Sequence, residues 1–253
     1  MSDFYPALVW RSFRAAFYRQ IMAYFTTPLA YVFVAVFLLA LGLFTWEAAR
    51  FFDTARADLA PFFLWHPWLY MIFMPALAMG LWSDEAAQGT GDLVFSLPVS
   101  LIGMVLGKLA AAWAVAGVML VFTLPMWATV SYLGSPDHAT IGLCYLVSFL
   151  MAGAYLALGS ACSAMSRNQV VAFVLGVVVA FFFTAAGWPI VLSGVRETFG
   201  ASAADMVASL SFLTQFDAAK QGILELRAVV YFLSVVLLGC GLSGLWAAKA
   251  RER

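Results

Sequence analysis

Few residues in this chain combine the types and the spacing that catalysis requires. The histidines are His66 and His138, and the three cysteines, Cys144, Cys162 and Cys240, lie apart in apolar runs. No HExxH, CxxC or GxSxG pattern occurs, so the signatures of a zinc hydrolase, a redox pair and a nucleophilic serine are missing. We therefore expect neither an enzyme nor a metal or cofactor site, and His66 is expected to be an interfacial residue.

The segment Gly103–Leu109 has only part of the pattern of a phosphate-binding loop. Such a loop has four residues between its glycines and a Ser or Thr after the lysine, whereas here three residues intervene and Leu109 follows Lys108. We predict that the chain does not bind ATP through this segment. Gly103 and Gly107 would instead allow another helix to approach closely, and Lys108 is expected to extend to the cytoplasmic lipid headgroups.

An acidic connection at residues 83–100 carries the strongest sign of a protein partner. Asp84 and Glu85 are expected to open a short helix that Gly89 ends, and a second short helix is expected from Asp92 to Ser96. The second helix contains three consecutive apolar residues that would be unfavourable if exposed to the cytosol. A docking surface for another protein explains them. The alternative is that this helix lies against the cytoplasmic ends of the chain itself.

The composition places the chain in a membrane. Hydrophobic residues make up 64% of the 253 residues and charged residues 10%, against about 45–50% and about 25% in soluble domains. The surplus of apolar side chains must face something other than water. With 13 basic and 13 acidic residues the net charge is zero, so no overall field attracts nucleic acid. Soluble enzymes, nucleic-acid binders and disordered regulators are excluded together.

The hydrophobic runs predict an all-α membrane protein with six transmembrane helices, since about 20 apolar residues are needed to cross a bilayer. The expected spans are Pro28–Trp46, Pro61–Leu81, Leu109–Tyr132, Ile141–Ala164, Val170–Val191 and Ala228–Ala248. They contain no Asp or Glu in their central stretches, which disfavours ion-coupled carriers and ion channels. Any transport would draw its energy from another subunit.

The distribution of basic residues predicts that both termini lie in the cytoplasm. Eight basic residues fall on the side of the termini: Arg11, Arg14, Arg19, Lys108, Arg167, Lys249, Arg251 and Arg253. Five fall on the other side: Arg50, Arg56, Arg196, Lys220 and Arg227. An even number of spans agrees with this orientation.

Residues 6–25 are expected to form an amphipathic helix in the membrane interface. Aromatic and apolar side chains recur there on one stripe, namely Trp10, Phe13, Phe17, Ile21 and Tyr24. Arg11 lies off this stripe and Arg14 at its edge, where arginines can reach phosphates. The alternative is an extension of the first span, although Thr26-Thr27-Pro28 predicts a break.

Residues 193–227 are too polar to span and too long for a turn, so two short amphipathic helices are expected outside the membrane. Ser202 or Asp205 would begin the first, and Asp217 would begin the second. The apolar residues of these helices would be Met206, Leu210 and Leu213 in the first and Ile223, Leu224 and Leu226 in the second.

Several of these segments follow the order found in the membrane subunits of ABC transporters of the ABC-2 family, which the chain resembles over nearly its whole length. The motifs are Thr27-Pro28-Leu29-Ala30-Tyr31, Glu85 with Gly89-Thr90, Leu97-Pro98-Val99-Ser100, Gly107-Lys108, Arg167-Asn168-Gln169, and Ser211-Phe212-Leu213 through Gly222, followed by Arg227 and Tyr231-Phe232. The resemblance is closest to the gliding-motility-type branch. Gly91-Asp92 departs from the family, where an acid is more often followed by leucines.

The resemblance implies a single permease domain over residues 1–253, in the bacterial inner membrane, that exports an unidentified substrate. Its expected partners are a cytoplasmic P-loop ATPase subunit that binds ATP and Mg, a second permease chain, identical or different, and membrane lipids. An extracytoplasmic accessory protein is a further candidate, and nucleic acid is not expected. The alternative is an ATP-driven anchor that transmits force in a motility or envelope-maturation complex and transports no cargo.

The resemblance also makes residues 83–100 the coupling segment that docks on the ATPase. Its expected docking residues are Glu85, Gly89, Thr90, Leu93, Phe95, Leu97 and Pro98. Glu85 and Thr90 would make polar contacts, and Leu93, Phe95 and Leu97 apolar ones. The interfacial helix, with Trp10, Arg11, Phe13, Arg14 and Phe17, would be the connecting helix of the family.

Overall fold

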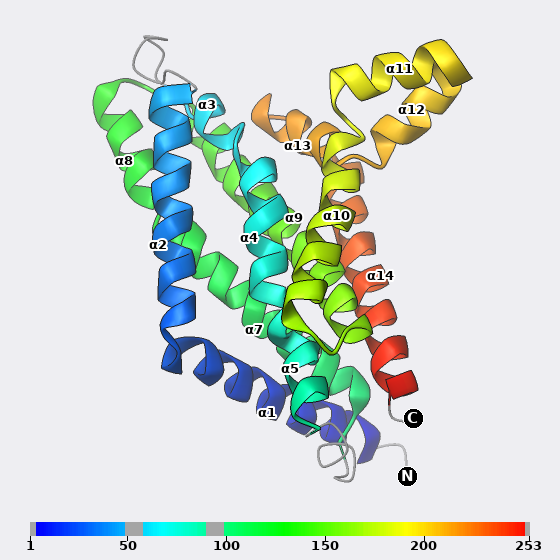
Figure 1. Ribbon diagram of the computed structural model, residues 1–253. Helices are drawn as coiled ribbons and strands as arrows, with labels where there is room; N and C mark the ends of the chain where they lie inside the picture. Colours follow the sequence, from blue (N-terminus) through cyan, green and yellow to red (C-terminus); the bar gives the residue numbers. More distant parts are fainter. Residues whose placement is uncertain (1–3, 49–57, 90–98, 251–253) are drawn as a thin grey trace.

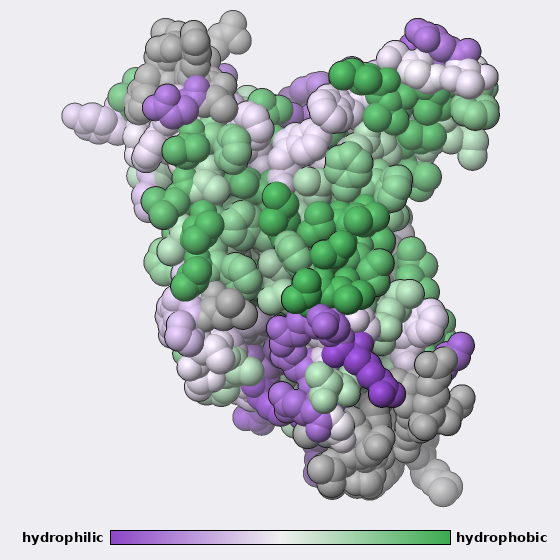
Figure 2. Space-filling view, viewed as in Figure 1, coloured by the Kyte–Doolittle hydropathy of each residue, from purple (hydrophilic) through white to green (hydrophobic). Residues whose placement is uncertain are grey.

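The computed structural model describes residues 4–48, 58–89 and 99–250. All regular structure in these residues is helical, as expected for an all-α membrane protein, and Figure 1 shows an upright bundle with one helix lying across its end. On the face seen in Figure 2, apolar side chains form a band around the middle and hydrophilic side chains lie toward both ends. Such a band matches the apolar core of a bilayer.

Five segments of the described chain are long and apolar enough to cross a membrane, or six if a bent pair of helices counts as one span. The five are Ala30–Glu47, Ala60–Gln88, Leu101–Leu133, His138–Met165 and Leu226–Lys249. The pair is α10 (Gln169–Ala185) with α11 (Pro189–Phe199), which meet at an angle of 71°. The predicted fifth span to Val191 is therefore too long, because the helix ends at Ala185 and Pro189 begins a new direction.

The chain begins with α1 (Phe4–Thr26), which lies across the end of the bundle, and turns upward into α2 (Pro28–Leu43) (Figure 1). The predicted break at Thr27 is confirmed, since Pro28 starts α2 at a position where its missing N–H costs nothing. The first span is completed by a π-helical turn, η1 (Phe44–Ala48).

The second and third spans are each built from consecutive short helices. The second consists of α3 (Ala60–Phe63), α4 (His66–Ala78) and α5 (Gly80–Gln88). The third consists of α7 (Leu101–Val121) and α8 (Leu124–Leu133). Proline stands in the first turn of α3, α4 and α8, and a first-turn proline is tolerated because its N–H would have no partner.

The centre of the bundle is α9 (His138–Met165), which is buried without interruption from Met151 to Ser163. It packs against α4, α5, α7 and α10, and against α14 (Leu226–Ala250). Small residues permit this packing: a Cβ on Gly159 would lie 2.8 Å from Ala78 Cβ, and one on Gly239 would lie 2.6 Å from the backbone of Ala157.

The start of α1 and the end of α14 lie at the same end of the bundle (Figure 1), which we call the termini end. At the opposite end, α11 and α12 (Ala201–Ser209) project sideways, followed by α13 (Phe212–Lys220). The prediction of short helices before the last span is confirmed, but their predicted number is wrong, because α12, α13 and the end of α11 all lie in residues 193–227. Pro189 begins α11, and Gly200, whose φ is 88°, separates α11 from α12. The pattern of apolar residues does not reveal these boundaries.

The predicted helix starts in this segment are also wrong. Ser211, rather than Asp217, precedes α13, and its hydroxyl accepts a hydrogen bond from the Leu213 N–H at 3.1 Å. Ser202 and Asp205 lie inside α12, which Gly200 precedes. Of the residues assigned to the second helix, Leu226 begins α14.

Candidate functional site

Charged side chains from three helices converge at the termini end. Glu85 is in the second half of α5, Arg19 in α1 and Lys108 in α7. The Glu85 carboxylate pairs with both cations: Arg19 contacts Oε1, and Lys108 Nζ lies 2.7 Å from Oε2. We call these three residues the Glu85 cluster. It joins the last turn of the second span to α1 and to the start of the third span.

Lys108 does not extend to the headgroups, so that prediction is wrong. Its side chain is 1% exposed, donates to the Leu81 carbonyl at 2.5 Å, and its Nζ lies 4.0 Å from the centroid of the Trp82 ring. A buried ammonium is tolerated only when it is paired and hydrogen-bonded. Glu85 and the Leu81 carbonyl meet this requirement.

The helix α1 packs directly on α7 through two glycines. A Cβ on Gly103 would lie 2.4 Å from the Val9 carbonyl oxygen, and one on Gly107 would lie 2.5 Å from that of Phe13. The predicted close approach at these glycines is confirmed, and its partner is α1. The side of α1 that carries Phe13 and Phe17 is consequently half-buried against the protein and does not face only lipid.

The remaining residues of the predicted interfacial set point outward. Trp10 is 63% exposed and stacks on Phe13 with 5.4 Å between ring centroids. Arg11 and Arg14 are exposed, and Arg14 lies over the Tyr18 ring. The arrangement of exposed arginines beside exposed aromatic rings suits a lipid interface, and that location stays a prediction.

The start of α5 is held to α9 by serine hydroxyls that sequence analysis did not single out for this role. Ser163 Oγ accepts from the backbone N–H groups of Trp82 and Ser83 at 3.0 and 3.1 Å, and donates to the Met79 carbonyl at 2.6 Å. Ser160 Oγ accepts from the indole N–H of Trp82 at 3.1 Å. These bonds satisfy backbone groups at the break between α4 and α5.

The coupling segment is described only at its two ends. Asp84 and Glu85 do not open a helix, because α5 begins at Gly80 and continues the second span. Gly89 ends α5 as predicted, with a φ of 66° that favours glycine. On the far side, the Ser100 N–H donates to Ser12 Oγ on α1 at 2.9 Å.

The other predicted docking residues lie outside the described part of the chain; they are Thr90, Leu93, Phe95, Leu97 and Pro98. Their contact with an ATPase stays a prediction, as does a direct contact by Glu85 or Gly89. Within the chain, both carboxylate oxygens of Glu85 already have basic partners.

The described residues offer no group of three or more His, Cys, Asp or Glu side chains that could hold a metal ion. His66 is fully buried, contrary to the interfacial position expected, and its Nδ1 lies 3.2 Å from the Phe62 carbonyl oxygen. His138 Nδ1 accepts from the Trp127 indole N–H at 3.0 Å. The convergent charged groups at the termini end can fix helices relative to one another.

Comparison with known protein families identifies a match over most of the chain. A family model described as ABC-2 family transporter protein matches residues 18–242, a range that includes all three members of the Glu85 cluster. No curated protein matches the chain. Assignment to the gliding-motility-type branch stays a prediction.

Proposed function

The chain belongs to the ABC-2 family of transporter proteins, as a membrane permease subunit, and from this premise we propose that it couples ATP hydrolysis by a separate ATPase to export of a substrate. The family implies pairing with a cytoplasmic ATPase subunit. ATP and Mg would bind to that subunit, because Gly103–Leu109 lacks the spacing and the hydroxyl of a phosphate-binding loop.

The observation that carries the proposal is the position of Glu85. Residues 83–100 leave from α5 and return at α7, and Glu85 ties the departing helix to α1 through Arg19 and to α7 through Lys108. A displacement of this segment by an ATPase would therefore move α1, α5 and α7 together. Since α5 continues the second span and α7 begins the third, the displacement would reach the membrane.

The proposed orientation places both termini and residues 83–100 in the cytoplasm, where the ATPase is. Lys108 is buried and no longer counts toward the charge bias of the surface. Seven basic residues still stand on the side of the termini against five on the other.

A second permease chain and lipids are the proposed partners within the membrane. The helices α2, α10 and α14 expose large apolar side chains, such as Leu39 at 72%, Phe182 at 67% and Leu237 at 69%. Apolar surface of this extent must be covered by lipid or by another chain. The α11–α13 region, at the opposite end, is the proposed contact for an extracytoplasmic accessory protein.

The double variant Leu93→Asp/Phe95→Asp is expected to abolish co-purification of the ATPase while membrane insertion is unchanged. Apolar contacts would be lost and two charges would have to be desolvated in the interface. The measurement is mild detergent extraction of the tagged chain, followed by quantification of the bound ATPase. The matched control is Ile190→Asp on α11, where the side chain is 72% exposed and the ATPase should be retained. Unchanged co-purification by the double variant would contradict the docking assignment.

The ATPase rate of the complex in liposomes tests export itself. Export predicts that the rate rises when the transported compound is present in the membrane or the cytoplasmic-side buffer. A rate that responds to no compound, in a complex that assembles normally, would instead favour the force-transmitting anchor.

A further inference from the structure

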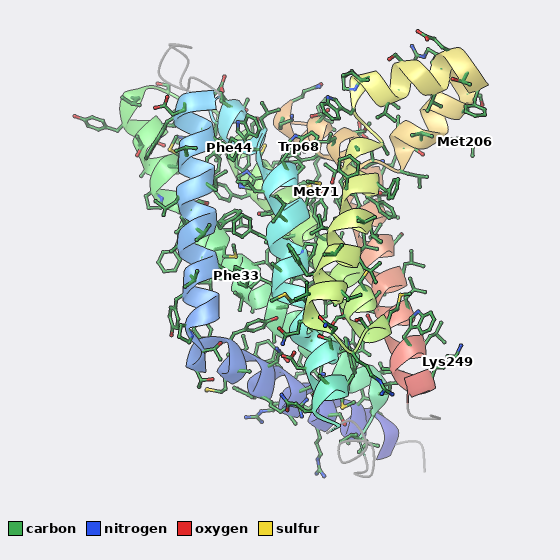
Figure 3. All side chains as sticks on the ribbon, viewed as in Figure 1. Phe33, Phe44, Trp68, Met71, Met206 and Lys249 are labelled. Atoms are coloured by element: carbon green, nitrogen blue, oxygen red, sulfur yellow. The ribbon has the colours of Figure 1, made fainter. Side chains whose placement is uncertain are left out.

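A cavity of about 280 Å³ opens beside the Glu85 cluster, at the level where the bundle meets α1. It lies between the second half of α1, the start of α2, the α4–α5 junction and the start of α10. Its lining is amphipathic: Gln20, Asp84 and Gln169 supply polar groups, and Phe33 and Tyr24 supply aromatic rings. Phe33 lies on the side of α2 that faces the bundle (Figure 3).

Asp84 supplies the negative charge of this cavity. Its side chain is half-buried, and its Oδ1 accepts a hydrogen bond from the Gln169 amide. Among the ion pairs of the described residues, none includes Asp84. Its neighbour Glu85 pairs with two cations. The direct partner of the Asp84 carboxylate among the described residues is thus a neutral amide, in a place that is partly removed from water.

The buried cation nearby, Lys108, attracts Asp84 through space but makes its direct contacts elsewhere. Lys108 donates to the Leu81 carbonyl and pairs with Glu85 Oε2. Asp84 Oδ2 lies close to the first turn of α5: a Cβ on Gly80 would lie 2.8 Å from it. A carboxylate in a partly desolvated cavity without a counter-ion in direct contact costs free energy, and a bound cation would recover part of it.

Two aromatic rings make the cavity suitable for an ammonium group in particular. The Tyr24 hydroxyl donates to the Leu77 carbonyl at 2.6 Å, and this bond holds the Tyr24 ring at the wall of the cavity. Burial raises the pKa of Tyr24 well above its usual range, and the charge of Asp84 raises it further. An aromatic face attracts a cation within about 6 Å of its centroid, and Tyr24 and Phe33 both line the cavity.

We propose that this cavity binds the ammonium group of an amphipathic molecule, with the nitrogen beside Asp84 and the alkyl chain along Phe33. The position suits such a ligand, because hydrophilic surface borders the apolar band at the termini end in Figure 2. Two sources share this chemistry: an aminophospholipid of the bilayer, and an amphipathic amine dissolved in the membrane. The inference concerns this chain alone and does not rest on its pairing with an ATPase.

The test is equilibrium binding of radiolabelled dodecylamine to the full-length chain, purified in dodecyl maltoside. We expect saturable binding of one dodecylamine per chain, which dodecanol at the same concentration does not displace. Asp84→Asn should weaken binding at least tenfold, since it removes the charge and keeps the shape. Asp205→Asn, at an exposed position of α12, is the matched control and should bind like the wild type.

A second variant keeps the proposal testable if Asp84→Asn does not fold. Ala23 lines the cavity and is exposed, so Ala23→Trp should fill the site without disturbing the core. It should also weaken binding at least tenfold. Equal binding by this variant and the wild type, equal binding by a folded Asp84→Asn variant, or displacement by dodecanol would each overturn the proposal.

Mass spectrometry of co-purified lipids distinguishes the two sources. At least threefold enrichment of phosphatidylethanolamine over phosphatidylglycerol on the wild type, relative to Asp84→Asn, would support an aminophospholipid as the occupant. Identical lipid profiles, together with Asp84-dependent dodecylamine binding, would support a dissolved amphipathic amine. If neither phosphatidylethanolamine enrichment nor Asp84-dependent dodecylamine binding is found, the proposed site is overturned. Co-purification of the ATPase is measured separately and would be unaffected by that result.

Discussion

Replacing Glu85 with glutamine is expected to lower the free energy of unfolding by about 3 kcal/mol. The substitution leaves the Lys108 ammonium without its carboxylate, and the Lys108 side chain is only 1% exposed. Removing one partner of a buried ion pair costs about 3–5 kcal/mol, because the remaining charge stays buried. We use the lower end of that range since Glu85 itself is 19% exposed. Unfolding by sodium dodecyl sulfate in mixed micelles, followed by circular dichroism, measures the change.

The chain offers two matched controls for this result. Arg19→Gln removes the other partner of Glu85, but the Arg19 side chain is 50% exposed, so a loss below about 1 kcal/mol is expected. The double variant Glu85→Gln/Lys108→Met removes both buried partners. It should be more stable than Glu85→Gln alone, because an apolar replacement of a buried pair is often neutral or stabilising.

The same variants separate two roles of Glu85. If Glu85 acts by holding α1, α5 and α7 together, Glu85→Gln destabilises the chain even in the absence of the ATPase. If Glu85 instead acts only by contacting the ATPase, the isolated variant is as stable as the wild type and only co-purification is weakened. A Glu85→Gln variant with unchanged stability would therefore contradict the structural role of the cluster.

The residues around Glu85 illustrate what the sequence could and could not predict. Gly89 was recognisable as a helix end because its role depends on local backbone conformation. The inward pairing of Glu85 was not, because it depends on which face of α5 meets α7. The charges of Arg19 and Lys108, both expected at the same side of the membrane as Glu85, were the available signal. Complementary charges there could have suggested a pair.

Five of the six spans and the break at Thr27 could be predicted because hydropathy and proline act over short stretches of chain. The roles of Ser160 and Ser163 could not be predicted, because the sequence around a serine in an apolar helix does not show whether its hydroxyl bonds its own helix or another. The helix α11 was missed for a different reason. Residues up to Val191 are as apolar as a span, and the 71° turn before α11 depends on Trp188-Pro189, a local signal that was not used.

The contact between α1 and α7 yields the second large expected effect. The variant Gly103→Ala/Gly107→Ala adds methyl groups that clash with the backbone carbonyl oxygens of Val9 and Phe13. These oxygens lie 2.4 and 2.5 Å from an ideal Cβ at the two glycines. Backbone cannot move aside as a flexible side chain can, so α1 should separate from α7. Overpacking of this kind costs about 1–3 kcal/mol at each site.

Limited trypsin digestion detects the separation, because α1 contains Arg11, Arg14 and Arg19, and cleavage of a packed helix requires local unfolding. We expect the double variant to be cut within α1 at least tenfold faster than the wild type. Gly241→Ala is the control: a Cβ there would meet no heavy atom within 4 Å, so the variant should digest normally and gain up to about 1 kcal/mol from helix propensity.

The consequence for function follows from where the substitutions lie. They leave residues 83–100 unchanged, so the ATPase should still co-purify, but α1 would no longer move with α5 and α7. Docking without substrate-dependent ATPase activity is the expected result in liposomes. Normal digestion of the double variant would instead mean that α1 does not depend on these glycines, and normal activity with a detached α1 would mean that coupling does not pass through it.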